Sequence, residues 1–402
     1  MNFIGDFVLL YPIVMSTIWI VGSLFNKLNT FLVEKQERMF YYPKISILLP
    51  CFNEVETIEQ TVQSIMELDY PKFELVMIDD CSQDETLTKM IQLKQRFEGE
   101  HDISIIHQEE NGGKARGLNR ALMMIDSDYC VVMDSDSSVE KSAVTRLMHV
   151  LLNHPEVGAV TGAPIIRNRT SLLGKLQTLE YVGIIGNIKQ AQNFYLNHIM
   201  TISGVLVCYR VDALKSIHYF NPSAMTEDID ATWRLYTKQW KVAYEPTAHC
   251  YILAPETIKG LLRQRTRWAV GGLEVFLKYG KKFRQMATSE RFLIGEMFFS
   301  NLWSIGMLLC IVSSIVRGMI DHSFAFSGIV LGFYMIIGLI QFSIGYINDH
   351  DYAYLTWQDK WLSPIYIFIY WMVNMITALI AMGQLLLNKN GDGKWESSDR
   401  GL

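Results

Sequence analysis

Residues 129–136 read Tyr-Cys-Val-Val-Met-Asp-Ser-Asp, a short apolar run that stops at two carboxylates, Asp134 and Asp136. Alternate side chains of a strand share a face, so the pattern predicts that both carboxylates lie together at the end of a strand. In open α/β sheets, ligands bind at this end of the strands. Two carboxylates there suit a hard divalent cation that also carries phosphate oxygens. The other interpretation is a turn rich in Asp and Ser that caps the strand.

Strands and helices alternate around this run and are joined by short polar turns. The alternation predicts a mostly parallel α/β sheet with polar turns at its ligand-binding edge, and we expect one soluble domain over 44–255. Besides the run above, the predicted strands are 45–50, 73–78, 103–107, 158–166 and 205–209, and the predicted helices begin at Thr57 and cover 86–97, 118–125 and 171–192.

The helix over 171–192 carries several leucines on one side. This pattern is typical of a helix that packs into a protein core. It is equally typical of a helix that lies on a membrane surface. The sequence leaves both interpretations open.

Four long runs carry no charged residue: 7–25, 297–316, 324–347 and 362–387. Each is near or above the ~18–20 apolar residues that cross a bilayer as a helix. Half of all residues are hydrophobic, and the mean hydropathy is +0.15. We therefore predict a transmembrane helix within 1–27, interfacial helices over 256–291, three transmembrane helices over 292–387 and a short tail over 388–402.

Lysines and arginines follow the first apolar run, within 27–44, and precede the second, within 278–291. Cytoplasmic ends of membrane spans carry such an excess, so we predict a multi-pass cell-membrane protein with its α/β domain in the cytoplasm and its tail outside. The net charge of −5 gives no support for nucleic-acid binding. The six cysteines include no CxxC pair and indicate small buried hydrophobes, not a disulfide framework or a zinc site.

A set of motifs carries a resemblance to a known family. It comprises Asp80 within Asp-Asp-x-Ser, Asp134-x-Asp136, Thr226-Glu227-Asp228 and Gln264-x-x-Arg267-Trp268. On an α/β domain between membrane spans, this order resembles the inverting processive glycosyltransferases of family 2. Further stretches at 161–168, 201–205 and 397–401 are similar to the bacterial poly-β-1,6-N-acetylglucosamine synthases. The resemblance implies a GT-A fold, a UDP-N-acetylglucosamine donor, and growth and export of a β-linked polysaccharide of biofilms.

The resemblance also implies a nucleotide pocket. Asp80 would accept a hydrogen bond from uracil, and Asn53 and Glu54 would line the same pocket. The alternative for Asp80 is a helix cap or an Asx turn. Lys114 follows two glycines at a predicted helix start, where backbone N–H groups favour phosphate; the alternative is a plain turn with a solvated lysine.

The acidic motifs would carry the reaction. Asp134 and Asp136 would hold Mg²⁺ or Mn²⁺ against the diphosphate, with Asp136 as the more direct ligand. Asp228 would be the general base that takes the proton of the acceptor hydroxyl. Glu227 would support the acceptor pocket. The alternative for 226–228 is a helix start with Thr as cap and acids in the first turn, and both interpretations can hold together.

The last motif would contact the pyrophosphate of the donor and the acceptor sugar. Arg267 would contact the pyrophosphate, and Trp268 would form a floor under the acceptor sugar. Gln264 and Arg265 would orient this helix or add to the clamp. The alternative for Arg267 and Trp268 is anchoring to the membrane.

Rival functions follow from the same residues. One is a synthase of another polymer, such as chitin-, hyaluronan- or cellulose-like chains, or a glycosyltransferase that makes a glycolipid. A rival of a different class is a membrane scaffold or transporter with an inactive α/β domain. Because four spans are few for a polymer tunnel, we also expect a small membrane accessory subunit.

Overall fold

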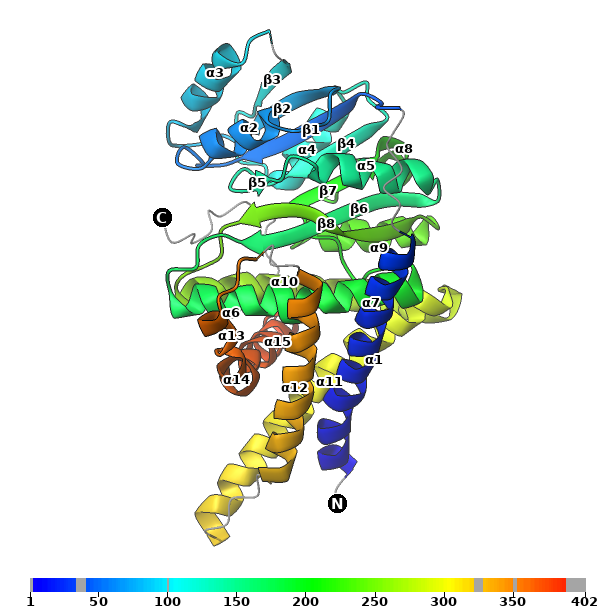
Figure 1. Ribbon diagram of the computed structural model, residues 1–402, viewed down its shortest axis with the longest axis vertical. Coiled ribbons are helices and arrows are strands. Elements are labelled where there is room, and N and C mark those ends of the chain that lie inside the picture. Colours follow the sequence, from blue (N-terminus) through cyan, green and yellow to red (C-terminus); the bar gives the residue numbers. More distant parts are fainter. Residues whose placement is uncertain (1–2, 34–40, 100, 322–327, 350–352, 388–402) are drawn as a thin grey trace. The chain divides into compact units, whose positions relative to one another are not determined.

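The computed structural model describes residues 3–33, 41–99, 101–321, 328–349 and 353–387 (Figure 1). The chain divides by its contacts into two compact units. Among the described residues, the sheet unit comprises 41–99, 101–169 and 197–260, and the helical unit comprises 3–33, 170–196, 261–321, 328–349 and 353–387. Each is described by itself.

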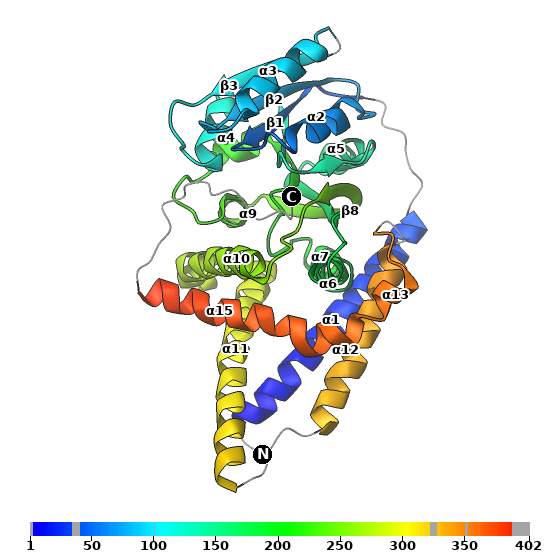
Figure 2. The ribbon, with the colours of Figure 1, turned by 90° about the vertical axis from the view of Figure 1, so that its left-hand side faces the viewer.

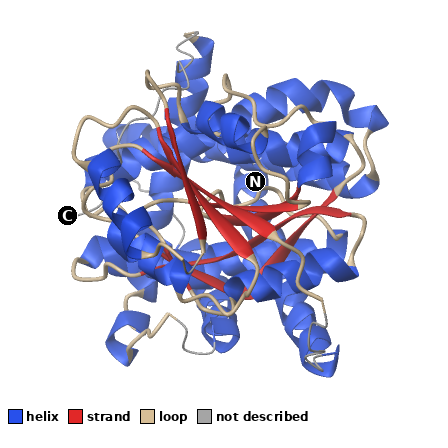
Figure 3. Ribbon diagram, turned by 90° about the horizontal axis from the view of Figure 1, so that it is seen from above, coloured by secondary structure: helices blue, strands red, loops and turns tan. Residues whose placement is uncertain are grey.

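The sheet unit is built on one mixed sheet with the strand order β3-β2-β1-β4-β7-β6-β8-β5. Its strands twist strongly across the unit (Figure 3). The bounds of the strands are β1 Ile45–Cys51, β2 Phe73–Asp79, β3 Asp102–His107, β4 Tyr129–Met133, β5 Ser138–Val139, β6 Val157–Ile166, β7 Leu206–Arg210 and β8 Lys241–Ile252.

The core of this sheet lies at β1, whose residues are all buried. It pairs in parallel with β2 and with β4, and β2 pairs in parallel with β3. Strands covered on both faces read as continuous apolar runs, which explains why the sequence predicts them so closely. The parallel pairing brings the ends of β1, β2 and β4 to one edge, where Asp80 and Asp134 follow their strands.

Beyond β4 the sheet differs from the predicted, mostly parallel arrangement. The pairs β4–β7, β6–β7 and β5–β8 are antiparallel, and only β6–β8 is parallel. The sequence prediction missed β8, because Glu245 and Pro246 interrupt its apolar pattern. The helices of this unit are α2 Ile58–Met66, α3 Thr86–Arg96, α4 Lys114–Leu122, α5 Ala143–Asn153, α8 Val211–Ser216 and α9 Glu227–Thr237.

The helical unit contains the apolar helices. Among the described residues its longer elements are α1 Phe3–Val33, α6 Leu172–Glu180, a π-helical turn η1 Tyr181–Ile185, α7 Gly186–Leu196, α10 Ile258–Tyr279, α11 Thr288–Asp321, α12 Gly328–Asp349, a second π-helical turn η3 Tyr366–Tyr370 and α15 Trp371–Leu386. Its shorter elements are η2 Gly280–Gln285, α13 Trp357–Lys360 and α14 Ser363–Ile365.

The predicted helix over 171–192 forms α6, η1 and α7 and packs within the helical unit against α1 and α12. Gly183 of η1 has no room for a side chain, because an added Cβ would lie 2.2 Å from the Phe342 ring of α12. By its contacts, the segment Thr170–Leu196 groups with the helical unit, although it lies inside the range 44–255 that the sequence predicts as one soluble domain.

Three described helices are long and apolar enough to cross a membrane: Phe3–Leu28, Thr288–Ile320 and Trp357–Leu386. We expected four spans; α12 is not among the three, and the start of its predicted run lies outside the described residues. Within the helical unit, α15 runs across the direction of α11 and α12 (Figures 1 and 2). The expected outer position of the tail concerns 388–402, which also lie outside the described residues.

Candidate active site

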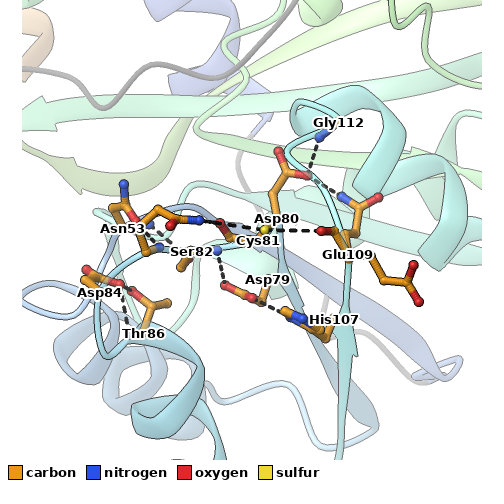
Figure 4. Close-up of polar contacts among 12 residues, drawn as sticks. Asn53, Asp79, Asp80, Cys81, Ser82, Asp84, Thr86, His107, Glu109 and Gly112 are labelled. Atoms are coloured by element: carbon orange, nitrogen blue, oxygen red, sulfur yellow. Dashed lines mark hydrogen bonds and ion pairs between the residues drawn. The ribbon is translucent and has the colours of Figure 1, made fainter.

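The turn after β2 is organised by Asp80, whose side chain is 1% exposed. Its Oδ1 accepts a hydrogen bond from Gly112 N at 2.9 Å (Figure 4). Oδ1 also accepts from Gln108 Nε2 at 2.5 Å, and Oδ2 accepts from Gly113 N at 2.8 Å. Burial raises the pKa of this carboxyl, while the two backbone N–H groups oppose the rise. Asp80 thus fixes the glycine turn that precedes α4.

Gly113 in this turn has a φ of +82°, in the left-handed region that favours glycine. The next residue, Lys114, begins α4, several residues before the predicted helix start. The Asp80 carboxylate therefore holds the turn from which α4 begins.

Asn53 and Glu54 connect the ends of β1 and β2. Asn53 N donates to Ser82 Oγ at 3.0 Å, and Asn53 Oδ1 accepts from Gln83 N at 2.7 Å (Figure 4). Glu54 N donates to Thr86 Oγ1 at 2.7 Å, and the Glu54 side chain is 1% exposed. Both residues lie at the end of the strands where the nucleotide pocket is expected. Their hydrogen bonds join the loop after β1 to the loop after β2.

Sequence reasoning missed the buried neighbour of Asp80. Asp79 is fully buried at the end of β2, and its Oδ2 lies 2.7 Å from Nδ1 of His107 at the end of β3 (Figure 4). The Asp-Asp pair was the available signal, but the partner on another strand could not be read from it. This contact secures β3 beside the turn that holds Asp80.

Lys114 joins acidic residues that are far apart in the sequence. Its Nζ lies 2.6 Å from Asp134 Oδ1 and 2.9 Å from Glu227 Oε1, and it donates to Gly204 O at 3.3 Å. Only 15% of the lysine side chain is exposed. Burial alone lowers the Lys114 pKa, but Asp134 and Glu227 more than offset this effect. The solvated-lysine alternative does not describe this side chain.

Asp228 lies beside this cluster, at the start of α9. Its Oδ1 accepts from Ile229 N at 2.8 Å and its Oδ2 from Gly204 N at 3.0 Å. Burial, followed by the neighbouring Glu227, raises the Asp228 pKa to about 6, although Lys114 and both N–H groups act to lower it. A carboxylate that is ionised near neutral pH and keeps proton affinity suits a general base.

Gly204 is a further site residue whose role sequence reasoning did not assign. An added Cβ would lie 3.1 Å from Asp228 Oδ2 and 3.3 Å from Lys114 Nζ. These distances are tighter than ordinary van der Waals contact, so a larger residue here would push against both side chains. The signal was its place in the stretch 201–205, but nothing there indicated which side chains it would meet.

Thr226 occupies the N-cap position of α9, and acids fill the first turn, as one of the two interpretations expected. Its side chain makes no capping hydrogen bond, and its buried hydroxyl has no hydrogen-bond partner. The acidic side chains stabilise the first turn instead, because the positive end of the helix dipole favours negative charge.

Asp134 and Asp136 follow β4 and are both half-buried. Burial and the charge of Asp136 raise the Asp134 pKa, while Lys114 lowers it. Among the described residues, no three His, Cys, Asp or Glu side chains are placed to hold a metal ion. Two carboxylates fit a hard cation only if other oxygen ligands, such as a diphosphate, complete its coordination.

The residues Gln264 to Trp268 lie on α10 in the helical unit. Arg265 is 6% exposed, and its Nη2 lies 2.7 Å from Oε2 of the buried Glu180. Its guanidinium carbon lies 4.4 Å from the centre of the Trp268 ring. Arg267 is exposed, whereas Gln264 and Trp268 are half-buried. Of the two roles expected for Arg265, orientation of the helix matches these contacts.

Within the sheet unit, these contacts link Asp80, through its glycine turn, to Lys114, Asp134, Glu227 and Asp228. A model of the family described as "Glycosyltransferase like family 2" matches residues 43–271. The chain belongs to glycosyltransferase family 2. The family-2 glycosyltransferase is thus an enzyme of the class that the motifs predicted.

Relatives of this glycosyltransferase cover nearly the whole chain. It is 35% identical to a poly-β-1,6-N-acetyl-D-glucosamine synthase of Staphylococcus epidermidis, over 99% of this chain and 98% of the relative. It is 34% identical to the synthase of that name from Staphylococcus aureus strain COL, over 98% of each chain. The chain therefore belongs to the family of these synthases, which confirms the resemblance seen in the sequence.

A solved structure supports the fold. The mannosyltransferase of Pyrobaculum calidifontis, in complex with GDP-Man and Mn²⁺, matches 96% of this chain and 99% of its own, with a TM-score of 0.64 at 16% identity. The likeness concerns the fold alone. The predicted GT-A fold is confirmed.

Proposed function

We propose that this glycosyltransferase transfers N-acetylglucosamine from UDP-N-acetylglucosamine, with inversion, to a growing β-linked poly-N-acetylglucosamine chain. The observation that carries the proposal is identity of 35% to a poly-β-1,6-N-acetyl-D-glucosamine synthase over nearly the full length of both chains. The cluster of Lys114, Asp134, Glu227 and Asp228 supplies the chemistry that such a transfer needs.

Asp228 is the general base of the proposed reaction. It takes the proton of the acceptor hydroxyl while the hydroxyl oxygen attacks the anomeric carbon and the UDP leaves. Two of the roughly four acceptor positions of its carboxylate are used by Ile229 N and Gly204 N, which leaves positions for the acceptor hydroxyl. The two N–H groups hold the carboxylate in place.

The donor lies along the strand ends in this proposal. Asp80 uses three of its roughly four acceptor positions within the protein, and the remaining one accepts from the uracil N–H. Asn53 and Glu54 line the same pocket. Lys114, at the start of α4, lies where an ammonium group and backbone N–H groups both favour the diphosphate.

Asp134 and Asp136 would hold Mg²⁺ or Mn²⁺, with Asp136 as the direct ligand. Such a cation neutralises the charge that develops on the departing UDP. Lys114 restrains Asp134 and offsets its charge beside the acids of α9.

The α10 residues complete the site in this proposal. Arg267, which is exposed on its own unit, contacts the pyrophosphate, with Gln264 beside it. Trp268 forms the floor under the acceptor sugar. Glu227 supports the acceptor pocket while it is paired with Lys114.

In this proposal, the membrane helices determine on which side of the membrane the reaction occurs. Three helices have the composition of membrane spans, and basic residues flank the ends next to the α/β domain, which supports a cytoplasmic site. Three spans are few for a polymer tunnel, which favours a small membrane accessory subunit that completes the polymer path. Undiminished polymer synthesis and export by the purified chain alone would count against that subunit.

The test offers radiolabelled UDP-sugars one at a time to membranes that contain the chain, with Mg²⁺ or Mn²⁺. We expect incorporation from UDP-N-acetylglucosamine into a polymer that a β-N-acetylglucosaminidase degrades. Preference for UDP-glucose would favour a cellulose-like product, and label only in a lipid fraction would favour a glycolipid. If no sugar is incorporated, the inactive scaffold gains support.

A further inference from the structure

The helical unit contains a buried ion pair that the proposed reaction does not use. Glu180, at the end of α6, is 2% exposed, and Arg265 of α10 is 6% exposed. Their Oε2 and Nη2 atoms lie 2.7 Å apart. Breaking such a pair from one side leaves an uncompensated buried charge, so each residue restrains the other strongly.

Glu180 collects donors from more than one helix. Its Oε1 accepts from Asn374 Nδ2 of α15 at 3.1 Å, while Oε2 takes the arginine of α10. One carboxylate therefore fastens α6, α10 and α15 together, and Figure 2 shows α15 passing next to the other two helices.

Both π-helical turns of the described residues adjoin this carboxylate. The turn η1 begins at Tyr181, directly after Glu180, and η3 runs from Tyr366 to Tyr370. The hydroxyls of Tyr366 and Tyr370 lie at the Glu180 carboxylate, and Arg265 Nε is buried without a hydrogen-bond partner. Single π-helical turns are rare and occur frequently at functional sites. Their coincidence here marks this junction as more than ordinary helix packing.

The pair acts on Trp268 through Arg265. The guanidinium stacks on the Trp268 ring at 4.4 Å, one helical turn along α10. Because Glu180 holds the guanidinium in place, the ring gains a fixed support on one side. Trp268 keeps part of its surface exposed, which leaves ring surface for a ligand.

We propose that Glu180 is a positioning residue for transfer: through Arg265 it holds the Trp268 ring in the orientation that carries the acceptor sugar. This inference rests on the proposed function, because it takes Trp268 as the acceptor floor. Glu180 itself touches neither substrate. Its loss should weaken the hold on the growing chain and leave the binding of UDP-N-acetylglucosamine unchanged.

The test compares full-length wild-type and Glu180→Gln enzyme in membranes at equal protein levels. We expect the mean polymer length to fall about tenfold, while the KM for UDP-N-acetylglucosamine changes less than twofold. Glu180→Asp, which keeps the charge, should restore much of the length. The Glu180→Gln/Arg265→Gln double variant should lose no more than the stronger single variant, because both substitutions break one interaction.

Lys175→Gln is the matched control. Lys175 lies on the same helix, α6, and its Nζ lies 3.0 Å from Oδ1 of Asp359 in α13. This ion pair joins α6 to α13 and does not involve α10. It should leave the polymer length unchanged. The inference is overturned if Glu180→Gln makes polymer of wild-type length, if it raises the donor KM as strongly as it shortens the chains, or if Lys175→Gln has the same effect. Wild-type enzyme that makes no polymer from UDP-N-acetylglucosamine would instead refute the proposed function.

Discussion

Two buried charge clusters, one in each unit, are built on opposite principles. Around Lys114, one ammonium faces the carboxylates of Asp134 and Glu227, with Asp228 close by, and the side chains keep partial exposure. Around Arg265, one guanidinium meets one carboxylate, and both are almost fully buried. The first cluster has excess acid and access to ligands, so it can take part in proton transfer. The second is balanced and closed, so it can hold neighbouring side chains in place but cannot exchange protons with a substrate.

The largest expected difference concerns stability. Arg265→Met leaves Glu180 buried and unpaired, and we expect a loss of about 3–5 kcal/mol in the free energy of unfolding. Lys114→Met leaves partly exposed acids that water and protons can reach, so about 1–3 kcal/mol is expected. Thermal unfolding of both variants in detergent measures the contrast. Equal losses would show that the two clusters do not differ as described.

The pH dependence should follow the acidic cluster. Because the Asp228 pKa is raised to about 6, the carboxyl is protonated below that pH and cannot act as the base. We expect transfer to be constant above about pH 7 and to fall roughly tenfold for each pH unit below about 6. UDP binding measured over the same range is the control. A transfer rate that stays flat down to pH 4.5 would remove Asp228 from this role.

Asp80→Asn should weaken the binding of the donor nucleotide. The amide keeps only one acceptor oxygen where the carboxylate serves two backbone N–H groups and Gln108, so the turn before α4 loosens. We expect UDP to bind about tenfold more weakly, as titration calorimetry would record. Glu85→Gln, a change at an exposed position shortly after the same loop, is the control. Unchanged UDP affinity in the Asp80 variant would separate Asp80 from the nucleotide pocket.

Gly204→Ala should have the smallest effect. The added Cβ would lie 3.1 Å from Asp228 Oδ2 and 3.3 Å from Lys114 Nζ, and both side chains can give by a few tenths of an ångström. We expect transfer to fall about threefold to tenfold with the KM for the donor nearly constant. Gly5→Ala, where no atom lies within 4 Å of an added Cβ, is the control. A fully active Gly204 variant would show that this close approach is not needed.

The sequence predicted the parallel half of the sheet well, because strands such as β1 and β2 are buried on both faces and read as apolar runs. It missed β8, whose apolar pattern is interrupted. It left the placement of α6 and α7 open, since an amphipathic pattern says that a helix covers an apolar surface but not which surface. That surface is provided by α1 and α12, which are distant in the sequence.

The acidic site residues were predicted from their motifs, but their contacts were not. Lys114 and Glu227 are far apart in the sequence and come together only in the folded chain, so no local pattern predicts their ion pair. Arg265 and Arg267 are two residues apart and chemically alike, yet one is buried and the other is exposed. Their roles depend on which side of α10 packs against neighbouring helices. Those helices lie elsewhere in the chain, so the local sequence does not reveal the buried side.

The proposed reaction depends most directly on Asp228, and one variant tests this role. Asp228→Asn keeps the size of the side chain and removes the base, so radiolabelled UDP-N-acetylglucosamine should enter polymer at least about a hundredfold more slowly than with wild-type enzyme. UDP affinity should stay within twofold. A variant that transfers at the wild-type rate, or one that loses UDP binding along with transfer, would contradict the assignment of Asp228 as the general base.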